Sequence, residues 1–188
     1  TISNASADEV ETEIRAQIAL AEKMGMPITH LDSHMGTLFY SKPFFERYIK
    51  VGIEKQIPIM LPSGRGEPKN DAEKMIMPQI REAAKVVWEG GLPVLDYLFT
   101  STADTGDAKE MTEALQQRIR DLEPGVTQII LHGTRPGCNF HAISGSGEKR
   151  NAELEMVLSA EVKKVIEEEG IILTTYRELM ERRKAVKE

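Results

Sequence analysis

Short apolar runs typical of strands alternate along this chain with longer segments of helical periodicity. The apolar runs lie at 27–32, 57–61, 92–98, 126–131 and 171–173. An alternation of strands and helices predicts parallel strands joined by right-handed crossovers. The sequence therefore predicts an α/β fold with a mostly parallel sheet, and the length of 188 residues predicts a single domain.

The helical segments carry recognisable start signals. Ser6 with Glu9 and Thr175 with Glu178 have the spacing of a capping box, in which two side chains satisfy the first backbone donors of a helix. Pro78 lies inside another helical segment, where proline breaks or kinks a helix. The predicted helices start near residues 7 and 176 and otherwise cover 42–56, 71–89, 107–121, 148–157 and 159–169.

Composition excludes several classes of function. The net charge is −6 with no basic stripe, which argues against binding nucleic acid through its phosphates. No apolar run approaches the roughly 20 residues of a membrane span, so no membrane partner is expected. Cys138 is the single cysteine, which excludes an internal disulfide framework and predicts a reducing compartment, the cytoplasm.

The segment Thr29-His30-Leu31-Asp32-Ser33-His34 ends the first predicted strand. On a strand, alternate side chains face the same way, so His30, Asp32 and His34 are expected to share a face. Imidazole nitrogen and carboxylate oxygen are ligands of Zn²⁺ and similar ions. The alternative is a polar strand end with hydrogen-bonded histidines, and the spacing alone leaves both readings open.

Other polar residues follow the later predicted strands. Arg65 comes after the second, Asp104 after the third and His132 after the fourth. The carboxyl ends of parallel strands meet at one edge of a sheet, where ligands bind in such folds. We therefore expect these side chains near the first motif, and in particular we expect His34 and His132 to face a shared cavity.

Three segments resemble one family. Thr29–His34 resembles the T-H-x-D-S-H signature of the YdjC-like carbohydrate deacetylases, and Pro124–His132 is similar to their P-G-V-x-E-x-x-x-H segment. Residues 170–179 are similar to their closing strand and helix. Two departures stand out: Met35 begins a stretch where the family carries further histidines, and Gly133 replaces the proline that usually follows the histidine of the fourth strand.

The resemblance implies a distorted (β/α) barrel, of which this chain would supply about the C-terminal two-thirds. The family begins with strands that carry an N-A-D-D-F-G type motif and a G-L-H motif, and neither is present here. The resemblance therefore implies that this chain lacks roughly the first third of the enzyme. A sheet edge left open in this way should be covered by a partner chain or a second copy, which predicts a homo-oligomer.

The resemblance also implies metal-assisted hydrolysis of the N-acetyl group of an acetylated amino sugar. A divalent ion, Mg²⁺ or Zn²⁺, would polarise the amide and lower the pKa of bound water. His34 matches the family's metal-ligand position, and the other two ligands belong to the absent part. His132 fits the general acid that protonates the leaving amine, while Asp32 fits a residue that orients a histidine.

Two assignments stay open at this stage. Arg65 lies between two glycines and could reach substrate, or be a solvated loop arginine. His30 either supports the residues of the site directly or is a buried, hydrogen-bonded strand histidine without a role in it, and we favour the second.

Two alternatives to the deacetylase also stand. One is a catalytically incomplete fragment that binds carbohydrate or a protein partner. The other is a different metal-dependent hydrolase on the same fold, such as a phosphoesterase.

Overall fold

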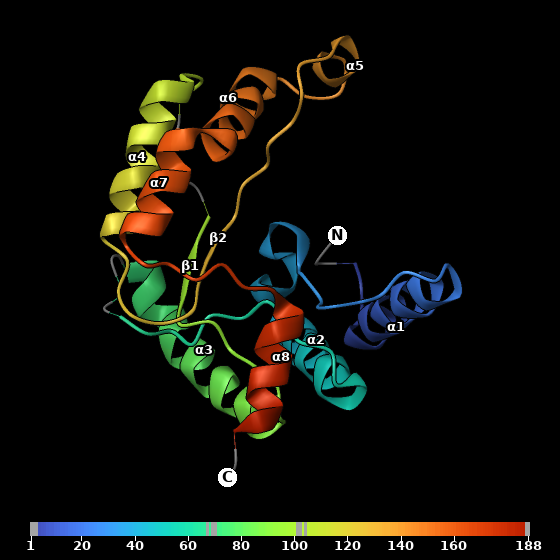
Figure 1. Ribbon diagram of the computed structural model, residues 1–188. Helices are drawn as coiled ribbons and strands as arrows, with labels where there is room; N and C mark the ends of the chain where they lie inside the picture. The colour runs from blue at the N-terminus through green and yellow to red at the C-terminus, as the bar shows by residue number, and fades with distance from the viewer. Residues whose placement is uncertain (1–3, 67, 69–70, 101–102, 104, 187–188) are drawn as a thin grey trace. The chain divides into compact units, whose positions relative to one another are not determined.

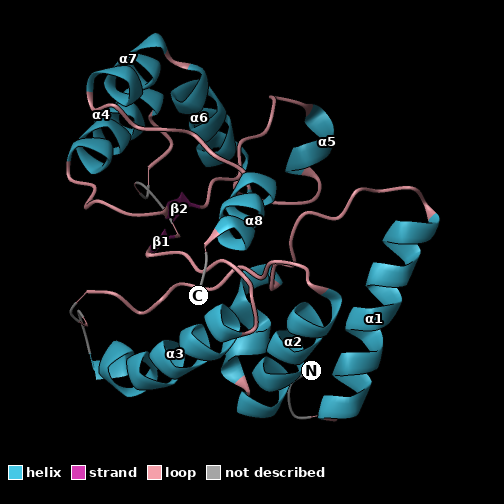
Figure 2. Ribbon diagram, turned by 60° about the horizontal axis from the view of Figure 1, so that its bottom comes forward, coloured by secondary structure: helices cyan, strands magenta, loops and turns pink. Residues whose placement is uncertain are grey.

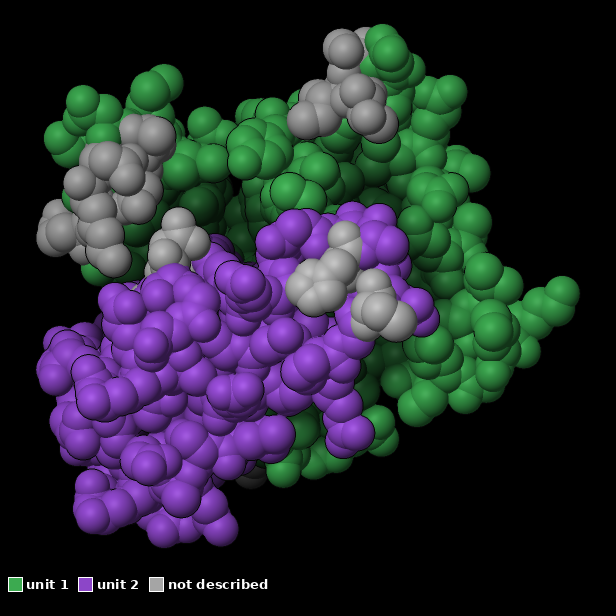
Figure 3. All heavy atoms as spheres, turned by 90° about the horizontal axis from the view of Figure 1, so that it is seen from above, with its two compact units in different colours: residues 1–96, 174–188 green, residues 97–173 purple. Residues whose placement is uncertain are grey.

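The computed structural model describes residues 4–66, 68, 71–100, 103 and 105–186. The chain divides into two compact units, which Figure 3 colours separately. Unit 1 comprises residues 1–96 and 174–188, and unit 2 comprises residues 97–173. Each unit is described by itself below.

Unit 1 is built mainly from helices that pack around α2 (Figures 1 and 2). Its elements are α1 (Ala7–Lys23), the 3-10 helix η1 (His34–Tyr40), α2 (Lys42–Lys55), α3 (Asp71–Glu89) and α8 (Tyr176–Ala185). The helices start where the sequence predicted. Ser6 and Glu9 form the capping box of α1, and Thr175 and Glu178 form that of α8. Pro78 lies inside α3 without ending it, so of the two predicted effects, a break or a kink, the break does not occur.

The first three predicted strands of unit 1 pair in parallel, but only at single positions. Leu31 forms a parallel bridge with Ile59, in which the Leu31 N–H donates to Pro58 at 2.8 Å. Pro62 forms a second parallel bridge with Leu95. The parallel direction is therefore confirmed, while the regular pairing is much shorter than the predicted runs.

Unit 2 holds the one pair of strands with a continuous register in the described residues. β1 (Tyr97–Phe99) runs parallel to β2 (Thr127–Ile129), with Leu98 opposite Gln128. The helices of this unit are α4 (Ala108–Arg120), α5 (Cys138–His141), α6 (Gly147–Leu158) and α7 (Ala160–Glu168). Asp107 and Ser159 cap α4 and α7 through their side chains. α5 falls in a stretch where the sequence predicted neither a helix nor a strand.

The predicted strand at 171–173 is not present in the structure. The N–H of Ile171 donates to the Ile166 carbonyl at 3.0 Å, so it still belongs to the hydrogen bonding at the end of α7. Ile172 and Leu173 are 84% and 75% exposed. An apolar run needs a neighbouring strand to supply a ladder, and the described residues supply none here.

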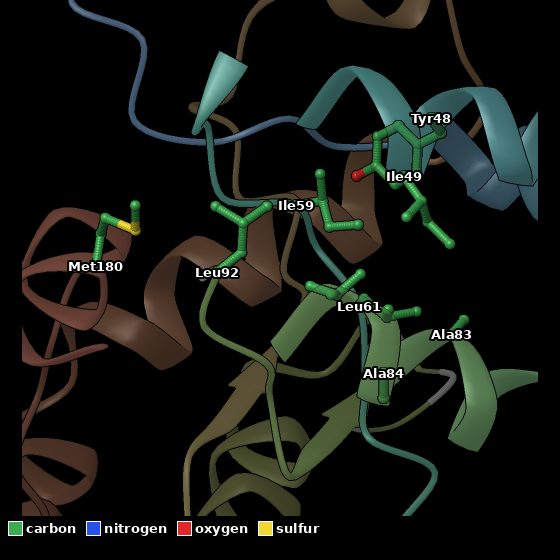
Figure 4. Close-up of a cluster of buried hydrophobic side chains, with 9 residues drawn as sticks. Tyr48, Ile49, Ile59, Leu61, Ala83, Ala84, Leu92 and Met180 are labelled. Atoms are coloured by element: carbon green, nitrogen blue, oxygen red, sulfur yellow. The ribbon is translucent and has the colours of Figure 1, made fainter. Parts of the chain in front are cut away.

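Each unit has its own hydrophobic core. The core of unit 1 joins α2, α3 and α8 to the first strand segments (Figure 4), and its buried members are Tyr48, Ile49, Ile59, Leu61, Ala83, Ala84, Val87, Leu92 and Met180. The core of unit 2 lies among α4, α6 and α7, and consists of Met111, Leu115, Ile119, Ala152, Met156, Val162 and Val165. These cores fix the strand ends from which the polar residues project.

The fold is thus α/β, with a small parallel sheet and many helices. Among the described residues, no helix has both the length and the apolar character that crossing a membrane requires.

Candidate functional site

The structure brings His30, Asp32 and His34 together around one pocket of unit 1. The pocket has a volume of about 620 Å³. Glu13 and Gln17 of α1 also line it. The three residues that the motif singled out therefore share one cavity with further polar side chains, and whether they share one face of a strand stays a prediction.

His34 occupies a turn, and this differs from the strand position that the motif suggested. It is the first residue of η1, is exposed, and is followed by Met35 and Gly36 with φ of 54° and 65°. Ser33 is 3% exposed; its hydroxyl accepts the N–H of Leu38 at 3.0 Å. The left-handed pair turns the chain sharply, and a non-glycine residue adopts this conformation at a cost. His34 is thus an exposed residue of the turn that lines the pocket.

His30 is held more firmly than His34. Its Nδ1 lies 3.0 Å from the hydroxyl of Thr29, and its ring stacks on Tyr176 with centroids 4.1 Å apart and planes at 12°. Burial lowers the pKa of His30, and the negative charge of Asp32 partly opposes that shift. A histidine with a lowered pKa is neutral at pH 7, so one ring nitrogen of His30 is a donor and the other an acceptor.

Asp32 is an exposed carboxylate whose charge reaches three aromatic side chains. Burial raises the pKa values of Tyr48 and Tyr176, and the charge of Asp32 raises both further. Asp32 thus acts electrostatically on Tyr48, Tyr176 and His30. Tyr176 was missed as a site residue by sequence reasoning, and the one signal available was its place directly after the Thr175 cap.

His132 lies in unit 2, after the end of β2, and its side chain is exposed. Its backbone N–H donates to the Oε2 atom of Glu153 at 2.8 Å. Glu153 belongs to α6 and is only 3% exposed. Because His34 belongs to unit 1, the cavity shared by the two histidines stays a prediction.

Arg65 is not among the described residues that line the pocket of His34. Its Nη1 atom lies 3.0 Å from Oδ1 of Asp96, and its N–H donates to the Ser63 hydroxyl at 3.2 Å. The guanidinium is thus paired with Asp96, and the backbone of Arg65 is bonded within its own loop. Asp104, the remaining residue of the predicted rim, lies outside the described residues.

The metal site implied by the motif is incomplete in the described part of the chain. His30, Asp32 and His34 supply donors of the right chemical type. Within the described residues, however, no three His, Cys, Asp or Glu side chains come together in an arrangement that could hold a metal ion. The residues present therefore do not by themselves fit a resident metal.

Parallel strand segments and helices, with His30, Asp32 and His34 around the parallel bridge at Leu31, define an α/β protein with a polar pocket at a strand segment of unit 1. More narrowly, the chain belongs to the YdjC-like protein family, whose model matches residues 1–168. A relative named carbohydrate deacetylase, from Thermoanaerobacter pseudethanolicus, is 27% identical over 176 residues.

That alignment covers 94% of this chain and 62% of the relative. A crystal structure of an Enterococcus faecalis protein named for cellobiose-phosphate cleavage has a TM-score of 0.72 at 24% identity, and covers the same shares, 94% and 62%. This likeness establishes the fold. The chain thus spans less than two thirds of the length of the proteins it matches.

Proposed function

We propose that this protein is a hydrolase that removes the N-acetyl group from an amino sugar or oligosaccharide. The observation that carries the proposal is the pocket of about 620 Å³ that His30, Asp32 and His34 line together. The family and the relative named carbohydrate deacetylase support the carbohydrate substrate and the deacetylation. The parallel strand segments support the further proposal that this chain forms part of a distorted (β/α) barrel.

Hydrolysis of an amide requires a proton for the leaving nitrogen, because an amide anion is too poor a leaving group. We propose His132 as this general acid, since its imidazole is exposed while its backbone is fixed by Glu153. Asp32 has the supporting role. Its charge acts on His30, whose other contacts hold the ring in one orientation.

His34 is our candidate for one ligand of a divalent ion, Mg²⁺ or Zn²⁺. The exposed imidazole at the turn is accessible to an ion. The remaining ligands would come from outside the described residues, because these do not complete a metal site. We also propose Arg65 as a substrate contact, which would require its guanidinium to leave the ion pair with Asp96.

The test measures acetate released from an N-acetylglucosamine oligosaccharide, with the protein expressed from its complete coding sequence. We expect activity that EDTA abolishes and that added Mg²⁺ or Zn²⁺ restores. His34→Ala should weaken metal binding, whereas His132→Ala should leave the metal bound and slow turnover by roughly 10²–10⁴-fold. Glu22→Ala, at an exposed residue of α1 that does not line the pocket, is the matched control and should change neither quantity.

The rival functions give different outcomes in the same assay. Carbohydrate binding without acetate release would indicate a binding domain, and hydrolysis of a phosphate ester without acetate release would indicate a phosphoesterase.

A calorimetric titration of Zn²⁺ into residues 1–188 alone should show weak binding. Tight stoichiometric binding that His34→Ala abolishes would mean that His30 and Asp32 complete the site, and would refute the assignment of ligands outside the described residues.

A further inference from the structure

We propose that Glu153 is a positioning residue that fixes the backbone of His132 and so places its imidazole for proton transfer. The inference rests on the proposed function, in which His132 is the general acid. The contact itself is a hydrogen bond of 2.8 Å from the His132 N–H to Oε2 of Glu153. Its acceptor is a carboxylate on α6 that is 3% exposed.

A buried carboxylate is costly to keep unless hydrogen bonds compensate for the lost hydration. Hydrogen bonds to an ionised acceptor are roughly twice as strong as neutral ones. Here the donor is the backbone N–H of His132, the residue that directly follows the predicted strand at 126–131, which contains β2. Glu153 lies beside Ala152, a member of the apolar core of unit 2. An apolar side chain would satisfy packing at position 153, but it could not hold this N–H.

The next two residues are also held against α6. The N–H of Thr134 donates to the Arg150 carbonyl at 3.0 Å. A Cβ atom at Gly133 would lie 3.2 Å from the Cα of Leu154, so only glycine lets the chain approach the helix this closely without a shift. Residues 132–134 are therefore fixed by α6 at three consecutive positions.

The imidazole of His132 remains exposed while its backbone is fixed. This arrangement suits a residue that must meet substrate in one place, because an error of about 1 Å at a reacting group can cost roughly 10²-fold in rate.

The first experiment follows the His132 amide by NMR hydrogen exchange in Glu153→Ala, Glu153→Gln and Glu155→Ala. Glu155 is an exposed carboxylate on the same helix and is the matched control. We expect the His132 amide to exchange roughly 10- to 100-fold faster in Glu153→Ala, because a hydrogen bond to a charged acceptor is lost. The glutamine variant keeps an acceptor oxygen and should restore most of the protection. Glu155→Ala should match the parent protein.

The second experiment measures acetate release by the same variants in the protein expressed from its complete coding sequence. Glu153→Ala should lower kcat roughly 10- to 100-fold with KM unchanged, and Glu153→Gln should recover most of the loss. A general loss of fold would instead remove protection across all of α6, and circular dichroism would detect it. Should Glu153→Ala not fold, Glu153→Gln carries the test, with a weaker but measurable loss of protection at His132 alone.

The two proposals fail in different ways. Unchanged exchange at His132 in a folded Glu153→Ala variant would overturn the inference about Glu153. An equal loss of kcat in Glu153→Ala and Glu155→Ala would overturn it as well. No acetate release by the parent protein would refute the proposed function, and with it the catalytic meaning of the contact. The exchange experiment would still show whether Glu153 fixes the His132 backbone.

Discussion

Tyr48→Phe is the substitution that tests most directly how the pocket is held in place. Tyr48 is 1% exposed, and its hydroxyl donates to the Leu31 carbonyl at 2.6 Å and accepts the Met60 N–H at 3.2 Å. Figure 4 shows this hydroxyl within the core of unit 1. The side chain therefore joins the strand segment that leads into Asp32 to the next segment of unit 1.

The expected loss follows from the hydrogen bonds, because phenylalanine keeps the ring and its packing against Phe39. The Met60 N–H retains its bond to Leu31, at 2.9 Å. One buried acceptor site on Leu31 is left unsatisfied, which costs about 1–2 kcal/mol of unfolding free energy. For a chain of this length that corresponds to a fall in Tm of roughly 2–8 °C.

The difference in stability between Tyr48→Phe and the parent protein should also depend on pH. Burial, and then the charge of Asp32, raise the pKa of Tyr48 above its ordinary value of 10.0. The folded state therefore keeps the phenolic proton while the unfolded chain releases it, so stability falls as the pH rises above 10. Phenylalanine has no such proton, and the difference between the two proteins should narrow in that range.

Urea unfolding followed by circular dichroism at about pH 7 and at about pH 10.5 measures both effects. Tyr40→Phe is the control, because Tyr40 is 77% exposed; it should stay within about 0.5 kcal/mol of the parent protein. The reasoning is refuted if Tyr48→Phe is also within that margin at pH 7, or if its deficit grows in alkali.

Three further predictions use the same assay. Gly52→Ala should cost about 1–3 kcal/mol, because its Cβ would lie 2.5 Å from Cγ2 of Ile59, whereas Gly145→Ala, with no atom within 4 Å, should be tolerated. Thr175→Ala should cost about 0.5–2 kcal/mol through loss of the α8 cap, and Thr175→Ser should restore most of it. Stability should fall as the pH drops below about 6.5, because the pKa of His30 is lowered in the folded state and the unfolded chain binds the proton more tightly. His30→Gln should reduce this acid sensitivity. The same loss of stability at low pH in His30→Gln and the parent protein would contradict the assignment.

The helices could be predicted from the sequence because their signals are local. Ser6 and Glu9 lie three positions apart and satisfy each other's backbone donors wherever the helix packs. The length of a strand is harder to predict, because each of its backbone positions needs a hydrogen-bonding partner on a neighbouring strand. The run at 57–61 pairs with its neighbour at Ile59, and the equally apolar run at 171–173 has no partner strand among the described residues. Apolar character alone could not separate these two cases.

The residues of the candidate site differ in the same way. His30, Asp32 and His34 could be named from the sequence because they lie within one segment, and the structure places all three at one pocket. Tyr176 and Glu153 reach the site residues only through tertiary contacts, and a single sequence contains no pattern for such pairs. The burial of Glu153 was therefore not predictable.

The two histidines of the motif differ physically, and this difference bears on which of them acts. His30 has its ring covered by Tyr176, one nitrogen engaged by Thr29 and a lowered pKa, which fits the packed state that the sequence favoured. His34 stands four positions later on a turn of left-handed backbone, exposed at the same pocket. In the proposed function, a ligand for an ion must be both reachable and held in place, and exposure of His34 beside buried Ser33 suits that role. His30 would then serve through its fixed, neutral ring, on which the charge of Asp32 acts.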